Sequence, residues 1–319
     1  MNGYVAIIGS GMMGSAIGAM SALAGKRTVL TDTDMERAEA GRAKAIQCIS
    51  LRREHGLHTE EEAETAINLL ETAGGIKEIG AAELVIEAIV EELEAKQKLF
   101  GQLDEILPDH VPICSNTSGL RITDISKLCR HPERTVTTHF WLPAHLVPLV
   151  EVVMGDKTDD SVAVMVRDEL RRWKKAPVLV KSDLPGQLAN RVFQAIIRES
   201  IDIVASGLAS AEDVDTAISC GMAMRFPVWG PLKHLDAIGL DLGLAVQETV
   251  LPDINGEKCP NVYLRNLVET GKLGVKTGHG FYDWTERRIE TDIEKRDRFI
   301  IEAVKATDVL NKEAGGMTD

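Results

Sequence analysis

Residues Tyr4–Gly14, YVAIIGSGMMG, join a short apolar run to a glycine-rich turn. The run Tyr4–Ile8 is partly β-branched, which is typical of a strand buried in a parallel sheet. The residues after Gly14, SAIGAMSALAG, are small and apolar and suit a buried helix that ends at Gly25. A G-x-G-x-x-G turn between such a strand and such a helix predicts the first unit of a doubly wound α/β sheet.

The glycines of this turn predict a binding site for a dinucleotide. Gly9 would permit the tight turn, Gly11 would let a pyrophosphate approach the backbone, and Gly14 would let the helix pack closely on the strand. A second strand, Thr28–Leu30, is followed by Asp32, eighteen residues beyond Gly14. A carboxylate there hydrogen-bonds the ribose hydroxyls and repels a 2′-phosphate, which favours NAD over NADP. The expected cofactor contacts of this region are Gly9, Gly11, Met12, Met13, Gly14 and Asp32.

The composition is that of an ordinary globular chain. Its 319 residues, 44% of them hydrophobic, are enough for two domains with real cores. The formal net charge is −13 and the acidic residues are spread along the chain, so neither nucleic acid nor an anionic membrane is expected as a partner. No apolar run approaches the ~18 residues of a membrane span. Five cysteines form no CxxC pair and no metal-ligand spacing, which predicts reduced thiols, a cytoplasmic location and no metal site.

The order of the remaining segments predicts two domains. Residues 34–75 are charged and helix-prone and favour two helices, as an arm that projects from the sheet. Strands are expected at 84–89, 111–115 and 177–180, and turn residues after the last of them place a boundary near 183–187. We therefore expect a Rossmann domain, 1–183, with a mainly parallel sheet, and a smaller all-α domain, 186–319. Helices are expected at 188–208, 211–222, 233–248, 262–270 and, as a charged tail, 286–314.

The stretch Thr138–Val153, THFWLPAHLVPLVEVV, sets His139 and Glu151 into an apolar setting. Two prolines between them predict a strand end, a bent connection and a returning strand that brings the two side chains together. A buried carboxylate that accepts the proton of one imidazole nitrogen leaves the other nitrogen free to take a proton from a substrate. The alternative from these residues alone is a core histidine and a charge at a strand edge.

Six segments resemble the 3-hydroxyacyl-CoA dehydrogenase family, and they cover nearly the whole chain. They are VAIIGSGMMG, LVIEAIVEELEAK, SNTSGL, HFWLPAHLVPLVEVV, LPGQLANRVF and KTGHGFYDW, in the family's order. The resemblance implies that His139 is the general base, that Glu151 orients it, and that Ser118 and Asn190 bind the reacting oxygen. Since Asn190 comes from the second domain, the active site is expected between the domains. Glu91, Lys96 and Lys276 match cofactor-contacting positions of the family, with ordinary surface charges as the alternative.

Three departures from the family pattern bear on the substrate. Leu142 stands where the family usually has an asparagine that contacts the cofactor, and Glu60, Glu61, Glu62 and Glu64 make the arm acidic where a polyanionic CoA would lie. The helix-prone tail is also longer than in the plain short-chain acyl-CoA enzymes. The sequence motif HFW…P.HLVPLVEV and the long tail are more similar to relatives that act on small carboxylate-bearing alcohols, such as the pyridine-carboxylate dehydrogenase of vitamin B6 breakdown.

The resemblance implies an NAD-dependent dehydrogenase of a 3-hydroxyacyl-CoA in fatty acid metabolism, and a homodimer joined through the helical domain. The first alternative keeps the chemistry but uses a small free acid. Its carboxylate would bind a cation, with Arg225 as the candidate, Arg121, Arg191 and Lys233 as further ones, and an ion-pair role for Arg225 left open. The second alternative is an NAD-binding protein without turnover, like relatives recruited as lens crystallins.

Overall fold

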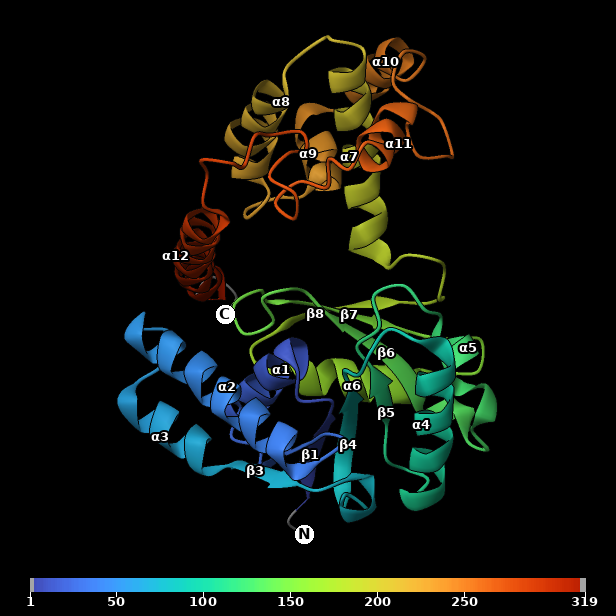
Figure 1. Ribbon diagram of the computed structural model, residues 1–319, viewed down its shortest axis with the longest axis vertical. Helices are drawn as coiled ribbons and strands as arrows, with labels where there is room; N and C mark the ends of the chain where they lie inside the picture. The colour runs from blue at the N-terminus through green and yellow to red at the C-terminus, as the bar shows by residue number, and fades with distance from the viewer. Residues whose placement is uncertain (1–2, 316–319) are drawn as a thin grey trace. The chain divides into compact units, whose positions relative to one another are not determined.

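The computed structural model describes residues 3–315, and the chain divides into two units between Leu188 and Ala189. A sheet with helices forms the first unit, and helices form the second (Figure 1). The ends of the two expected domains, residues 1–2 and 316–319, lie outside the described residues.

The first unit is built on an eight-stranded sheet with the order β3-β2-β1-β4-β5-β6-β7-β8. Every neighbouring pair is parallel except β6 and β7, which run antiparallel. The mainly parallel, doubly wound sheet expected from the sequence is thereby confirmed. The strands are β1 (Tyr4–Ile8), β2 (Thr28–Thr31), β3 (Leu70–Ala73), β4 (Ala82–Glu87), β5 (Ile113–Ser115), β6 (Thr135–Phe140), β7 (Leu149–Val153) and β8 (Ala176–Val180).

Helices cover both faces of this sheet and form two separate cores. Strand β1 supplies both, because successive side chains point to opposite faces: Val5 and Ile7 pack in one core, and Ala6 and Ile8 in the other. Helices α1 (Met12–Leu23), α2 (Met35–Glu54), α3 (Glu60–Asn68) and α6 (Asp160–Arg172) contribute to the first core, and α4 (Leu93–Ile106) and α5 (Ile122–Ile125) to the second (Figure 1).

The helical arm differs from the one expected. Ala38, Ala45 and Ile49 of α2 are fully buried, and Ala45 and Ile49 belong to the core that α1 fills, so α2 is a packed layer of the unit. The arm also ends before residue 75, because residues 70–73 form the edge strand β3, parallel to β2. Leu70 and Ala73 are buried there, and a four-residue strand leaves too short a pattern to be recognised from sequence.

The second unit is helical in its described part, as expected. Two of the expected helices are interrupted. The segment 211–222 is α-helical only to Ala217 and continues as a wider π-turn, and the segment 233–248 is divided at Gly239, whose φ of +99° a side chain would disfavour. No helix within residues 3–315 has the length and apolar character needed to cross a membrane. The helices are α7 (Leu188–Ala205), α8 (Ala211–Ala217), α9 (Pro231–Ile238), α10 (Leu240–Val250), α11 (Val262–Glu269) and α12 (Ile289–Gly315).

A buried ion pair joins α4 to the start of β6. The guanidinium of Arg134 donates to Asp104 Oδ1 from Nη2 at 2.7 Å and from Nε at 3.1 Å, and both side chains are at most 2% exposed. Asp104 Oδ2 accepts the backbone N–H groups of Arg130 and His131. Burial by itself raises the pKa of the Asp104 carboxyl, but these hydrogen bonds and the charge of Arg134 outweigh it and hold the pKa below its usual range.

Replacing Arg134 by methionine is expected to lower the free energy of unfolding by about 3–5 kcal/mol at pH 7, because it strands a buried carboxylate. The double variant Arg134→Met with Asp104→Leu is expected to lose less, because it removes the charge together with its partner. The pKa of Asp104 is lower in the folded chain, so its stabilising effect holds above the unfolded value and disappears as pH falls through the folded one. Urea unfolding between pH 7 and pH 3 measures both effects. A double variant with a lower free energy of unfolding than the single variant would contradict the ion-pair account.

Candidate active site

The glycine-rich turn leaves open space where a pyrophosphate would lie. A Cβ on Gly9, whose φ is +88°, would lie 2.7 Å from the Ala88 carbonyl oxygen, and one on Gly14 would lie 1.8 Å from the Gly9 carbonyl oxygen. These two glycines are therefore explained by the packing of the chain on itself. A Cβ on Gly11 would meet no atom within 4 Å, although Gly11 is the N-cap of α1. The free space lies at a helix N-terminus, which attracts anions, so the turn fits a dinucleotide.

Asp32 is held beside this turn, directly after β2. Its Oδ2 accepts the backbone N–H of Ser10 at 2.7 Å and the Ser10 hydroxyl at 2.8 Å, and its Oδ1 accepts the N–H of Thr33 at 2.8 Å. Burial raises the pKa of Asp32, but the hydrogen bonds from Thr33 and Ser10 outweigh it and leave the pKa below its usual value. The carboxylate is thus ionised at neutral pH, which suits NAD and opposes a 2′-phosphate.

The expected cofactor contact Lys96 is buried. Its ammonium is 1% exposed and lies 2.5 Å from Glu87 Oε1 and 3.4 Å from Glu91 Oε2. Glu87 itself is fully buried at the end of β4 and also accepts the Ser115 hydroxyl at 2.6 Å. The Lys96 ammonium therefore contacts two glutamate side chains at the carboxyl edge of the sheet.

Glu91 fixes the turn that carries Ser118. Its Oε1 accepts the Thr117 hydroxyl at 2.5 Å and the backbone N–H groups of Ser118 and Gly119 at 2.9 and 3.1 Å. Burial raises the pKa of Glu91, and the hydrogen bonds together with Lys96 lower it further than burial raises it. An ionised, half-exposed Glu91 thus shapes the loop after β5 and leaves Ser118 exposed.

His139 and Glu151 are direct neighbours across the antiparallel pair β6–β7. Their side chains meet, with His139 Nδ1 2.7 Å from Glu151 Oε2. Glu151 is fully buried and His139 is 5% exposed. A carboxylate that accepts the Nδ1 proton places the acceptor lone pair of the neutral ring on Nε2. The structure therefore brings together the two side chains that the sequence placed in one candidate site.

Trp141 is a third member of this group that the sequence analysis did not identify. Its indole Nε1 donates to Glu151 Oε2 at 3.0 Å, the same oxygen that His139 contacts. The rings of His139 and Trp141 lie 5.9 Å apart between centroids. The sequence did hold one signal for Trp141, because it comes two residues after His139, and residues two apart on an extended chain point to the same side.

Two buried cations hold the connection between β6 and β7, and the sequence analysis missed them as well. Lys175 donates to the carbonyl oxygens of Ala144 at 2.5 Å and Val147 at 2.8 Å, and Arg52 of α2 donates to the His145 carbonyl oxygen. Burial, aided by the charge of Arg52, lowers the pKa of Lys175 to about 7. The connection that follows His139 is therefore anchored at three carbonyl groups.

The remaining expected site residues belong to the second unit, apart from Arg121. Asn190 is half-buried in the first turn of α7, and Arg225, Lys233 and Lys276 are exposed. Arg191 follows Asn190 in α7. In the first unit, Leu142 is 54% exposed. Arg121 donates to the buried Asp183 carboxylate at 3.2 Å, so this cation is engaged in an ion pair.

The family models that match are described as the NAD binding domain of 3-hydroxyacyl-CoA dehydrogenase, over residues 4–184, and its C-terminal domain, over residues 186–284. The chain is 37% identical to a probable 3-hydroxybutyryl-CoA dehydrogenase of Bacillus subtilis, over 89% of this chain and 98% of that protein. It is similar in structure to 5-formyl-3-hydroxy-2-methylpyridine 4-carboxylic acid 5-dehydrogenase, an NAD⁺-dependent dismutase, with a TM-score of 0.87, 28% identity and coverage of 97% and 99%. An (S)-3-hydroxybutyryl-CoA dehydrogenase from Ralstonia eutropha gives a TM-score of 0.74 at 28% identity, over 90% of this chain and 100% of that one. With a dinucleotide turn, an ionised Asp32 and two matching domain models, the chain belongs to the NAD-dependent 3-hydroxyacyl-CoA dehydrogenase family.

Proposed function

We propose that the chain catalyses the reversible oxidation of a 3-hydroxyacyl-CoA to the 3-ketoacyl-CoA with NAD, and that His139 is the general base. The observation that carries the proposal is the 2.7 Å contact of His139 Nδ1 with the buried Glu151, near the carboxyl end of β6 in a dinucleotide-binding sheet. The resemblance to a probable 3-hydroxybutyryl-CoA dehydrogenase supports the substrate class.

Each residue of the site has its own role in the proposed reaction. NAD, held at the glycine-rich turn, would supply the acceptor for the hydride of the carbinol carbon. His139 Nε2 takes the hydroxyl proton, and Glu151 stabilises the imidazolium that forms. Ser118, in the turn fixed by Glu91, hydrogen-bonds the oxygen as it becomes a carbonyl. For Asn190 of α7 we keep the role that the family resemblance implies. In the reverse direction His139 returns the proton to the ketone oxygen.

The cofactor is held, in this proposal, by the glycine-rich turn and by Asp32. The open space at Gly11 takes the pyrophosphate, and Met12, which is 69% exposed, and Met13 flank it. Glu91 contacts the cofactor, and Lys96 acts through its ion pair with Glu91. For Lys276 we keep the cofactor contact that the family resemblance implies.

A second candidate is the same chemistry on a small free hydroxy acid or carboxylate-bearing alcohol. It is favoured by the TM-score of 0.87 to a pyridine-carboxylate dehydrogenase, compared with 0.74 to a CoA enzyme at the same identity of 28%. The first turn of α3 carries three exposed carboxylates, Glu60, Glu61 and Glu62, which oppose a polyanionic CoA.

Initial rates of NADH oxidation distinguish the two candidates. The substrates are acetoacetyl-CoA, free acetoacetate and a panel of small keto acids, at matched concentrations. Turnover of the thioester alone establishes the first candidate, and turnover of a free acid alone establishes the second. No turnover with either class, in a chain that binds NAD, would leave the non-catalytic NAD-binding alternative.

For a free-acid substrate, Arg225→Met is expected to raise KM roughly tenfold or more, because a charge-assisted hydrogen bond to the carboxylate is lost. The KM for NADH should not change. Lys258→Met is the matched control, since Lys258 is also an exposed cation of the second unit and is not a candidate for the substrate site. An unchanged KM in Arg225→Met would remove this residue from the substrate site.

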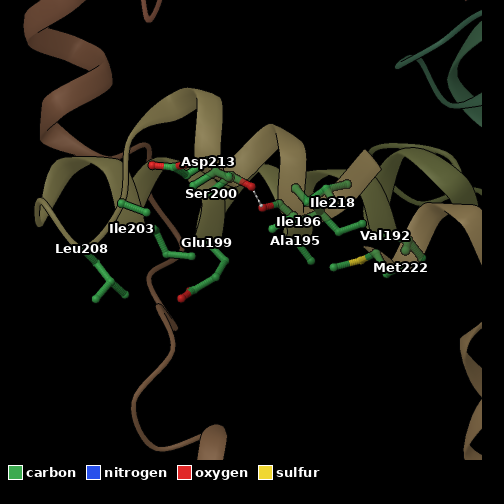
Figure 2. Close-up of a pocket in the computed structure, with 13 residues that line it drawn as sticks. Val192, Ala195, Ile196, Glu199, Ser200, Ile203, Leu208, Asp213, Ile218 and Met222 are labelled. Atoms are coloured by element: carbon green, nitrogen blue, oxygen red, sulfur yellow. Dashed lines mark hydrogen bonds between the residues drawn. The ribbon is translucent and has the colours of Figure 1, made fainter. Parts of the chain in front are cut away.

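We also propose that two copies of the chain associate through the second unit. Leu240, Leu244 and Val246 of α10 are each at least 50% exposed, and only Gly243 of this helix is buried. An apolar pocket of about 610 Å³ lies between α7 and the segment 208–222, lined by residues such as Val192, Ile196 and Met222 (Figure 2). Such apolar surface is typical of a subunit interface. Sedimentation of the wild type and of Leu240→Asp with Leu244→Asp tests this: a wild-type monomer would refute the dimer.

The proposed location is the cytoplasm. It rests on the state of the cysteines, all five of which are free thiols, with Cys220 and Cys259 exposed. Exposed thiols of this kind persist in a reducing compartment.

A further inference from the structure

Two N–H donors, one from His139 and one from Trp141, contact the same oxygen of the Glu151 carboxylate. His139 Nδ1 lies 2.7 Å and Trp141 Nε1 lies 3.0 Å from Oε2. Trp141 is partly exposed, whereas Glu151 is fully buried. Indole nitrogen is a donor only, so Trp141 cannot exchange roles with the imidazole.

Sharing one oxygen makes the two hydrogen bonds compete. When His139 is neutral, Oε2 carries its full negative charge and accepts strongly from the indole. When His139 is protonated, part of that charge is used by the imidazolium, and the indole contact weakens. The tryptophan therefore favours the neutral imidazole over the imidazolium, and burial of the carboxylate strengthens this effect because little water screens it.

We propose that Trp141 is a positioning residue that orients Glu151 toward His139 and lowers the basicity of His139 through their shared oxygen. This rests on the proposed function, in which His139 is the base. The indole donor takes up part of the carboxylate charge that would otherwise stabilise the imidazolium. It also fixes which carboxylate oxygen faces the ring.

Three other titratable side chains lie on or next to elements beside β6 and β7. On β5, the neighbouring strand, the Cys114 thiol is fully buried, and burial raises its pKa far above neutrality. Next to β8, Lys175 is tied to two carbonyl oxygens, and Arg52 of α2 is bound to a third. Glu151 is the carboxylate that contacts the ring, so the proton balance of His139 is expected to follow what else binds Glu151.

The test replaces the indole N–H and follows His139 directly. Trp141→Phe keeps an aromatic ring and removes the donor. A second variant carries benzothienylalanine at position 141, which has the shape of tryptophan with sulfur in place of N–H and guards against misfolding of the first. The control is Trp173→Phe, because the Trp173 indole also donates to a glutamate, Glu169, at 3.0 Å, outside the dyad.

Two readouts are measured in each variant. One is the titration of His139 by NMR with ¹³C-labelled histidine, assigned by comparison with His139→Gln. The other is the acidic limb of the pH profile of kcat/KM. Both position-141 variants are expected to raise the His139 midpoint by about 0.5–1 pH unit and to shift the acidic limb by the same amount, and Trp173→Phe is expected to shift neither.

The outcomes separate this proposal from the proposed function. An unmoved NMR midpoint in both position-141 variants overturns the role of Trp141, whatever the kinetics show. A moved midpoint with an unmoved acidic limb supports the coupling from Trp141 to His139 and overturns His139 as the base. Both readouts moving together supports both.

Discussion

The variant His139→Gln is expected to lose kcat by roughly 10²–10⁴-fold while NAD binds with unchanged affinity. Glutamine is close to histidine in size and can still donate a hydrogen bond to the buried Glu151, so the fold should be retained. It cannot take a proton, however, and the alcohol oxygen must then lose its proton to water. Single-turnover NADH formation measures the chemical step, and calorimetric titration with NAD measures binding.

His131→Gln is the matched control for this variant. His131 Nδ1 lies 3.2 Å from Glu133 Oε1, so it also forms a histidine–glutamate pair, but an exposed one outside the site. Its kcat should equal that of the wild type. If His139→Gln keeps its turnover, His139 is not the general base. The mechanism proposed for both substrate classes would then be wrong.

The pair Gly11→Ala and Gly14→Ala is expected to separate cofactor binding from folding. A methyl group on Gly11 meets no protein atom within 4 Å, so stability should fall by no more than the roughly 1 kcal/mol that alanine costs at an N-cap, but the methyl group occupies the space proposed for the pyrophosphate. NAD should bind roughly 10- to 100-fold more weakly, equivalent to about 1.4–2.8 kcal/mol. A methyl group on Gly14 would lie 1.8 Å from the Gly9 carbonyl oxygen, and a backbone atom cannot move aside cheaply. Gly14→Ala should therefore lose about 3 kcal/mol or more of stability.

Thermal unfolding and NAD titration of both variants check this contrast. The wild type and Gly25→Ala serve as references, because Gly25 has a positive φ but no atom near its added Cβ, and so reports backbone strain alone. Unchanged NAD affinity in a folded Gly11→Ala would mean that the pyrophosphate does not lie against this turn.

The parts of the fold that the sequence predicted are those in which local pattern and tertiary packing agree. Strand β1 is predicted by an apolar run with a glycine turn behind it, and β6 and β7 by a bent, proline-containing stretch between two apolar runs. Strand β3 was missed, because four residues at a sheet edge owe their conformation to pairing with β2. Helix α10 was merged with α9, because a single glycine inside a helical pattern does not reveal its positive φ.

The residues of the candidate site were likewise predicted only where their local sequence pattern indicated their role. His139 and Glu151 were predicted because their residue types suggest proton transfer and the chain between them returns. Trp141, Arg52 and Lys175 were missed, because an indole reads as an apolar side chain and a lysine or arginine as a surface charge. Only the structure reveals that Lys175 is 7% exposed and that its partners are carbonyl oxygens, which have no sequence signature.

The single antiparallel pair in the sheet has a consequence for how this chain can diverge. His139 and Glu151 face one another because β6 and β7 pair at those positions, and the length of the connection does not enter. Loops of different length between Trp141 and Leu149 could therefore be exchanged among descendants, and substrate preference altered there, while His139 and Glu151 stay paired. A one-residue deletion inside β7 would instead turn the carboxylate to the opposite face of the sheet. A change of length is thus tolerated better in the connection beyond Trp141 than in the strand.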